Sequence, residues 1–278
     1  MTVSNWLLKA SVEMISLTRS IETIGRKTVS SVEECGYAAA LFIESFYWLI
    51  FGNKRHQAVR LSAIINEARQ IGVDAVGISA VLCFAIGVML AIQGIETLKT
   101  FGAQSQVILG IALSVTREFS PLIIGILVAG RSGSSIAARI GTMNESQEID
   151  ALQVMGINPV RFIATPIFIA MLIMLPLLII LGDFMGLLGG AVYSYIELNI
   201  SFSAYAQRSF EVLTINDLSQ GLIKSFVFAN IIAIVSLSNG FQVKGGAEGV
   251  GHATTRAVVM SISYIVIADM IFTYFLNR

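Results

Sequence analysis

Five apolar stretches dominate the chain and limit what it can fold into. They lie at about residues 74–97, 105–130, 160–195, 220–241 and 256–276. Each stretch predicts a transmembrane helix, because a helix of about 20 apolar residues crosses the hydrocarbon core of a bilayer. Only 13% of the residues are charged, against roughly 25% in soluble domains. The sequence therefore predicts an all-α integral membrane protein with five transmembrane helices.

The region before these stretches, residues 1–73, has a different pattern. Residues 1–34 mix apolar and basic side chains, which is typical of an amphipathic helix at the cytoplasmic interface; an ordinary soluble helix is the alternative. Residues 36–51 are apolar but too short for a span, and Glu44 interrupts them. We expect an elbow or re-entrant segment there. Whether that segment crosses the bilayer stays open.

The placement of Lys and Arg predicts the orientation in the membrane. If residues 1–73, 131–159 and 242–255 are cytoplasmic, these segments and their immediate boundaries hold 13 of the 18 basic residues. Such residues accumulate in cytoplasmic loops, so we expect a cytoplasmic N-terminus and an external C-terminus. No repeat or second domain is visible, which predicts a single domain over residues 1–278 with a five-helix core at 74–278.

Several classes of function find no support in the sequence. The net charge is zero, which argues against nucleic acid as a partner. Cys35 and Cys83 lie in apolar surroundings, and His56 and His252 are isolated, so no metal site is expected. The glycine-rich segment 245–251 lacks the Lys-Ser or Lys-Thr of a phosphate-binding loop. No set of nucleophile, base and acid indicates an enzyme.

A charged pair, Arg117-Glu118, lies inside the second apolar stretch. An unpaired arginine at the bilayer centre costs about 2.5–3.5 kcal/mol on insertion scales. Glu118 does not simply neutralise Arg117, because neighbours on a helix point about 100° apart. The pair must face a protein interior or a wet cavity. Two interpretations stay open: a polar contact for an anionic headgroup or a gating pair, and a structural ion pair between helices.

Four other charged residues begin or interrupt the apolar stretches. Lys224 and Arg256 start the fourth and fifth stretches, and snorkelling to the interface fits Arg256 better than Lys224. Asp183 and Asp269 fall within spans and must find partners. Structural pairing is the plainer reading of these two acids, and a proton relay is the alternative.

A row of small residues, Gly182, Gly186 and Gly190, lies on one face of the third stretch. Small residues at this spacing let two helices approach closely. The row fits either a homodimer contact or packing within one chain.

The polar segment 131–159 predicts a second functional region. It begins with a glycine-rich GRSGSS, expected to turn out of the membrane, and continues into a helix-prone stretch with Glu145, Glu148 and Asp150. Residues 150–156, ending in Gly156, loosely resemble the loop by which transporter permeases dock ATPases. An uninvolved solvated loop is the alternative.

At these residues the chain resembles a known family. The matching stretches are GVMLAIQG (87–94), TREFSPLIIGILVAGRSGSSIAARIGTM (116–143), EIDALQVMGINPVRF (148–162), IKSFVFA (223–229) and GGAEGVGHATTRAVV (245–259). They resemble the MlaE/YrbE permeases, the membrane subunits of ABC transporters that work with MCE-domain proteins. The resemblance runs from roughly residue 60 to the C-terminus.

The resemblance implies a homodimer in the cell inner membrane, with its C-terminus in the periplasm. Two copies of a cytoplasmic ATPase would bind ATP and magnesium, so this chain would carry no cofactor. A periplasmic ring of MCE subunits would receive or deliver phospholipid or another lipid, in lipid trafficking or in maintaining outer-membrane lipid asymmetry. The direction of transport stays open. A proton-coupled secondary transporter and a non-transporting scaffold are the alternatives.

The resemblance also implies roles for particular residues. The implied lipid contacts are Arg117, Glu118, Gln93, Leu98, Phe101, Lys224 and Arg256. The stretch 140–156 matches a coupling helix, with Glu145, Glu148, Asp150 and Gly156 expected at the ATPase. Two positions depart from the family pattern, Arg139 and Ile167. Both flank the coupling segment, so we expect the ATPase contacts there to differ in detail.

Overall fold

The computed structural model describes residues 29, 32–49, 60–103 and 106–276. Within this part of the chain all regular structure is helical. The predicted all-α fold is therefore confirmed. Most of the predicted interfacial helix over residues 1–34 lies outside the described residues.

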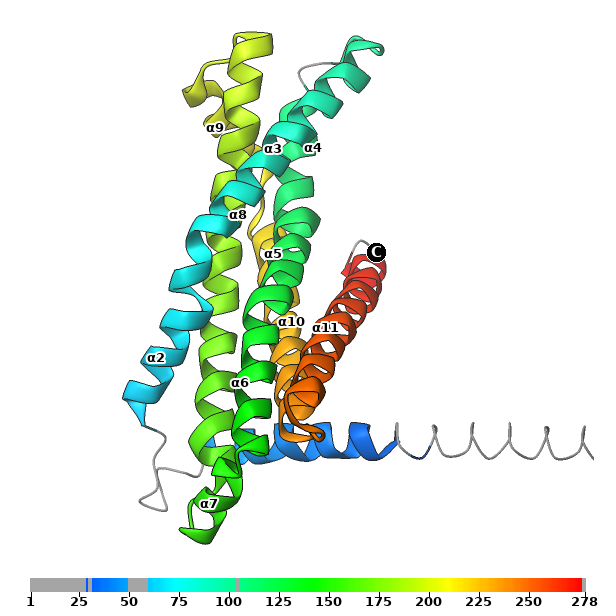
Figure 1. Cartoon of the computed structure of the whole chain (residues 1–278). Helices are drawn as coiled ribbons and strands as arrows, with labels where there is room; N and C mark the ends of the chain where they lie inside the picture. Colours follow the sequence, from blue (N-terminus) through cyan, green and yellow to red (C-terminus); the bar gives the residue numbers. More distant parts are fainter. Residues whose placement is uncertain (1–28, 30–31, 50–59, 104–105, 277–278) are drawn as a thin grey trace, which may run out of the picture.

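Five continuous helical spans form the body of the molecule (Figure 1). Their bounds are Leu61–Lys99, Val107–Glu145, Val160–Leu198, Ile215–Phe241 and Gly246–Leu276. Each is long and apolar enough to cross a membrane. The five predicted transmembrane helices are confirmed, and most of them extend beyond the predicted bounds.

Several spans are built from shorter helices. The first contains α2 (Leu61–Ile71), a 3₁₀ turn (Val73–Ala75) and α3 (Val76–Lys99). The second contains α4 (Val107–Ser114), α5 (Ser120–Val128) and α6 (Ser134–Glu145), joined by π-helical turns at Val115–Phe119 and Ala129–Gly133. The third begins with a π-helical turn at Val160–Ala164 and continues as α8 (Thr165–Leu198). The fourth and fifth are α10 (Ile215–Phe241) and α11 (Gly246–Leu276).

The expected turn at GRSGSS is wrong. The chain stays helical there and leaves the helix only after Glu145. Gly133 serves close packing, since an added Cβ would lie 2.9 Å from Oγ of Ser236 and 3.2 Å from Ile232 on α10. The small residue therefore brings two helices together without breaking either.

The glycine row on α8 packs within the chain. A Cβ at Gly182 would meet Cys83 of α3 at 2.9 Å, and one at Gly186 would meet Val115 at 2.7 Å. One at Gly190 would meet the hydroxyl of Tyr205 on α9 (Phe202–Val212) at 2.6 Å. Of the two readings of the row, the structure supports intrachain packing.

The two ends of the bundle carry different segments (Figure 1). One end holds α7 (Glu148–Val154), the turn between α10 and α11, and a helix over residues 32–49. The other end holds the α3–α4 connection and α9, with the C-terminal end of α11 directed towards it. Three segments predicted to be cytoplasmic are thus at the same end.

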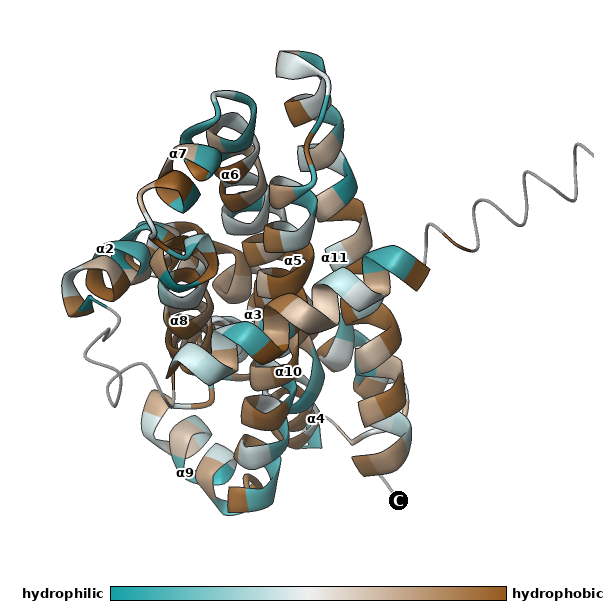
Figure 2. Cartoon of the chain, turned by 90° about the horizontal axis from the view of Figure 1, so that it is seen from below, coloured by the Kyte–Doolittle hydropathy of each residue, from teal (hydrophilic) through white to brown (hydrophobic). Residues whose placement is uncertain are grey.

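The helix over residues 32–49 runs across the bundle instead of along it (Figures 1 and 2). The ring of Phe42 packs edge-on against Phe168 of α8, with 5.7 Å between ring centroids. The amide of Asn158 donates a hydrogen bond of 2.7 Å to Glu44. The described part of this helix therefore lies across the ends of the spans, as expected for an elbow.

Candidate functional site

A buried lysine connects three spans. Lys224 on α10 is 1% exposed, and its Nζ lies 2.6 Å from Oε2 of Glu118 and 2.9 Å from Oδ1 of Asp269 on α11. It also donates to Oγ1 of Thr273 at 3.2 Å and to the carbonyl oxygen of Arg117 at 3.0 Å. The snorkelling interpretation does not apply to Lys224, because its ammonium group is enclosed by protein.

A second ion pair lies beside the first. Nε of Arg117 donates to Oδ1 of Asp217 at 2.7 Å. Asp217 also accepts from the backbone N–H of Thr214 at 2.8 Å and from its hydroxyl at 2.7 Å, which caps the start of α10. Asp217 is therefore held by the helix terminus while it pairs with arginine.

Local helix geometry brings the two pairs together. Arg117 and Glu118 lie in the π-helical turn Val115–Phe119, a distortion frequent at functional sites. Their partners Asp217 and Lys224 are seven residues apart, so they share one face of α10. Two adjacent residues of the second span thus reach two positions on the fourth.

We call Arg117, Glu118, Asp217, Lys224 and Asp269 the polar cluster. Three carboxylates face two cations in it, so one negative charge is in formal excess. The side chains of Arg117 and Glu118 are 32% and 31% exposed, whereas that of Asp217 is 2% exposed. Both residues of the predicted pair therefore form interhelical ion pairs and remain about one-third exposed.

Two residues of this arrangement, Asp217 and Thr273, were not predicted from the sequence. Thr273 donates to Oε2 of Glu118 at 2.9 Å. Its position four residues after Asp269 places both on one face of α11. Two spacings in the sequence could have indicated these residues: seven residues between Asp217 and Lys224, and four between Asp269 and Thr273.

Four other predicted lipid contacts form no hydrogen bond or ion pair with the polar cluster in the part of the chain that the structure describes. Gln93 is exposed on α3, Phe101 is 76% exposed beyond its end, and Leu98 packs beside Ala91 and Ile95. Among the described residues, none of these three is bonded to a member of the cluster. Arg256 lies towards the other end of α11, where its Nη2 is 2.6 Å from Oε2 of Glu34.

The predicted ATPase-coupling residues gather at one corner of the molecule. α6 ends at Glu145, and α7 follows after Gln147, whose φ is 60°. Glu148 and Asp150 are exposed in the first turn of α7. Gly156, with φ of 74°, closes the helix. A short helix with acidic residues is therefore present where one was predicted.

This corner also exposes apolar side chains that the sequence analysis did not single out. Val154 is 90% exposed and Met155 is 65% exposed, whereas Ile149 is 4% exposed and anchors α7 to the bundle. Acidic and apolar side chains thus lie together on a protruding element (Figure 1).

The two departures from the family pattern both make contacts within the chain. Nη2 of Arg139 lies 2.7 Å from Glu67 and its Nη1 donates to Gln70 at 3.0 Å, which ties α6 to α2. Ile167 is fully buried. Arg139 therefore links α6 to α2.

The other predicted membrane acid, Asp183, has a different kind of partner from Asp269. Asp183 is buried beside Gly182 and interacts with the side chain of Ser120, and no cation is paired with it among the described residues. The expectation of a partner is therefore met by a lysine for Asp269 and by a serine for Asp183. Within the described ranges, no group of three His, Cys, Asp or Glu side chains could hold a metal ion.

Comparison with known proteins identifies relatives over most of the chain. The family model described as permease MlaE matches residues 64–275. A probable ABC transporter permease protein of Rickettsia typhi is 34% identical over 255 residues, covering 92% of this chain and 96% of the relative. One from Synechocystis is 33% identical over 210 residues, covering 76% and 80%. The chloroplastic protein TRIGALACTOSYLDIACYLGLYCEROL 1 of Arabidopsis thaliana is 35% identical over 211 residues, covering 76% and 60%.

Proposed function

The chain belongs to the MlaE permease family, and from this premise we propose that it is the membrane subunit of an ABC transporter for phospholipid or a related lipid. The polar cluster carries this proposal. It holds charged groups at fixed positions inside an apolar bundle, with Arg117 and Glu118 about one-third exposed. Membrane-embedded charges that are paired and partly accessible are typical of substrate pathways.

A lipid is a suitable cargo for such a site. Its phosphate would meet the guanidinium of Arg117, which binds phosphate through two parallel hydrogen bonds. Its acyl chains would stay beside apolar helices, many of whose side chains are exposed. The name of the Arabidopsis relative contains that of a diacylglycerol lipid, which supports lipid as the substrate class.

The energy would come from a separate ATPase docked at α7. The exposed apolar pair Val154 and Met155, together with Glu148 and Asp150, forms a protruding surface suited to a protein partner. ATP and magnesium would be bound by that partner. Two states of the permease would expose lipid differently, and nucleotide binding would favour one of them.

The proposed assembly is a homodimer in the inner membrane with a periplasmic ring of MCE proteins. α11 buries only a narrow face, formed by Ala257, Ser261, Ile265 and Asp269. Its remaining apolar surface needs lipid or a second copy to cover it. In this arrangement α7 and the helix over residues 32–49 are cytoplasmic.

Gentle purification of the intact complex tests the proposal. Proteins and lipids that co-purify would be identified by mass spectrometry, with an unrelated membrane protein tagged in the same way as the control. An ATPase, an MCE-domain protein and enriched phospholipid are expected. Lipid movement that needs no ATPase and follows a proton gradient would instead support the secondary transporter. If a strain lacking this chain still transported lipid fully, the non-transporting scaffold would be the remaining interpretation.

A further inference from the structure

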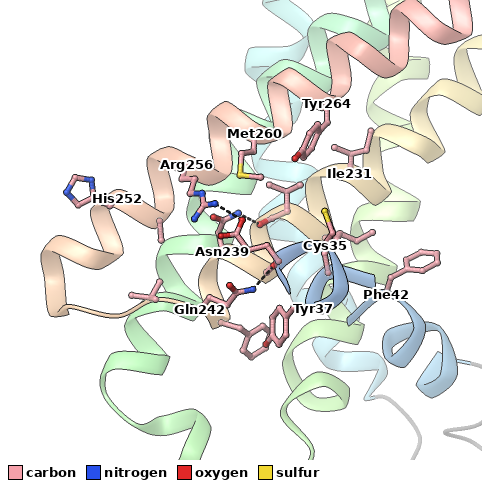
Figure 3. Close-up of a pocket in the computed structure, with 18 of the residues that line it drawn as sticks. Cys35, Tyr37, Phe42, Ile231, Asn239, Gln242, His252, Arg256, Met260 and Tyr264 are labelled. Carbon is pink, nitrogen blue, oxygen red and sulfur yellow. Dashed lines mark hydrogen bonds and ion pairs between the residues drawn. The ribbon is translucent and has the colours of Figure 1, made fainter. Parts of the chain in front are cut away.

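A large cavity lies away from the polar cluster, between α10, α11 and the helix over residues 32–49 (Figure 3). Its volume is about 1180 Å³, above the roughly 300–1,000 Å³ of typical small-molecule pockets. The transverse helix contributes Glu34, Cys35, Tyr37 and Phe42 to its wall. The cavity therefore has room for a ligand larger than most metabolites.

The lining of the cavity changes from polar to apolar along the bundle axis. The polar end is formed by Ser238, Asn239, Gln242, Lys244 and Arg256, and the apolar Phe241 and Val243 line it as well. The apolar end is formed by Val227, Ile231, Ile234, Met260 and Tyr264. Asn230 is the polar exception at that end, and its amide donates to the carbonyl of Phe226 on its own helix. Figure 3 shows the same order, with Gln242, His252 and Arg256 at one end and Ile231 and Tyr264 at the other.

The polar end carries two cations, Arg256 and the exposed Lys244. The carboxylate of Glu34 lies 2.6 Å from Arg256. At the rim, the exposed His252 lies 3.8 Å from the carboxylate of Glu248, so the cation without a carboxylate partner among the described residues is Lys244. Burial, and then the Glu44 carboxylate, raise the pKa of Tyr37, so its hydroxyl stays protonated and able to donate. This end is suited to an anionic oxygen ligand.

We propose that this cavity binds one glycerophospholipid of the cytoplasmic leaflet. Its phosphate lies between Arg256 and Lys244, and an acyl chain lies between Ile231 and Met260. The order of polar and apolar lining matches the order of headgroup and chain in a lipid whose headgroup is at the cytoplasmic end. This cavity site adds to the proposed function, because the polar cluster lies at a different height along the bundle.

The separation of the two sites follows from helix geometry. Arg256 and Asp269 are thirteen residues apart on α11, which is about 20 Å along a helix at 1.5 Å per residue. The hydrocarbon core is about 30 Å thick. One lipid headgroup cannot contact both residues, so the cavity and the polar cluster would hold different lipids.

The apolar half of the site is tested by placing a larger side chain in it. The full chain with its partner proteins would be purified, and bound phospholipid per chain counted by mass spectrometry. Met260→Trp places a larger ring in the apolar end of the cavity, and Val259→Trp adds the same ring at a 58% exposed position outside the lining. We expect Met260→Trp to retain about one phospholipid fewer per chain, since the ring occupies the position proposed for the acyl chain. Equal counts in the two variants would overturn the proposal.

The charged half is tested with the two sides of the Arg256–Glu34 ion pair. Each variant, Arg256→Gln and Glu34→Gln, breaks the pair, but only the first removes the phosphate ligand. After incubation with vesicles of mixed phosphatidylglycerol and phosphatidylcholine, Arg256→Gln should lose bound phosphatidylglycerol and Glu34→Gln should keep it. Equal loss in both would show a structural role for the pair and overturn the headgroup assignment.

The remaining outcomes separate this inference from other readings. A Met260→Trp complex that keeps its lipids but changes in mass would show that a second copy fills the cavity, and would overturn the proposal. If Arg117→Ala loses lipid while Met260→Trp does not, the proposed function stands and the cavity site fails. If Met260→Trp and Arg256→Gln lose lipid while Arg117→Ala does not, the cavity site stands alone.

Discussion

Lys224 and Glu118 form an ion pair of 2.6 Å in which the lysine side chain is 1% exposed. The same ammonium lies 2.9 Å from Asp269, so a single cation serves two carboxylates from two other spans. This arrangement makes α10 the central element of the cluster. It also makes the consequences of removing each charge unequal.

Lys224→Met should be more damaging than Asp269→Asn. The first change leaves two carboxylates facing each other without a cation, and breaking a buried ion pair in this way costs about 3–5 kcal/mol. The second leaves a balanced pair of Lys224 and Glu118. Thermal unfolding of the purified variants checks the order. Equal loss of stability would contradict the shared-cation arrangement.

Much of the architecture could be predicted from the sequence, because the cost of burying polar groups in lipid acts residue by residue. The sequence predicted the five spans, and it indicated that Arg117 and Glu118 form a pair that needs protein surroundings. It could not identify the partners of this pair, Asp217 and Lys224. Pairing depends on how the fourth span is rotated against the second, which only tertiary packing decides.

The wrong prediction of a turn at GRSGSS has a physical origin. Glycine permits a turn and also permits close helix packing, and at Gly133 contact with α10 decides for packing. A linear pattern does not contain that contact.

Arg117→Ala and Asp217→Asn should separate lipid binding from ion pairing. Both variants break the pair, but Asp217→Asn leaves the guanidinium free for a phosphate. We expect Arg117→Ala to retain several-fold less lipid in an assembled complex and Asp217→Asn to retain at least as much as the wild type. Lipid analysis of each purified complex provides the measurement. Similar lipid loss in both variants would show that Arg117 serves only as part of a structural ion pair.

Charge reversal on α7 should release the ATPase. Glu148→Lys and Asp150→Lys each place a cation on the exposed corner, and rim charges act on partner association. Val154→Asp should have a larger effect, since this side chain is 90% exposed and apolar. ATPase co-purification, expected to fall several-fold, is the readout. Glu96→Lys, an exposed change on α3, is the control, and an equal effect there would remove the assignment.

The pair of Arg139 and Glu67 should behave as a structural contact between α6 and α2. Its side chains are 36% and 17% exposed, so Arg139→Glu should lower stability by about 1 kcal/mol or less. The double exchange Arg139→Glu with Glu67→Arg should recover most of this loss in a thermal unfolding series. If the exchange does not recover stability but ATPase co-purification falls, Arg139 acts mainly at the partner.

The close approach of α3 and α8 makes a final prediction about the glycines. A Cβ at Gly87 would overlap the backbone carbonyl of Gly186, which no side-chain rotation relieves, whereas Gly110 has nothing within 4 Å. Gly87→Val should therefore cost at least about 1–3 kcal/mol from overpacking, and Gly110→Val should be tolerated. Unfolding temperature and the oligomeric mass of each variant are the measurements. If Gly87→Val lost the mass of the dimer while its stability stayed unchanged, this glycine contact would be assigned to the interface between two chains and not to the interior of one.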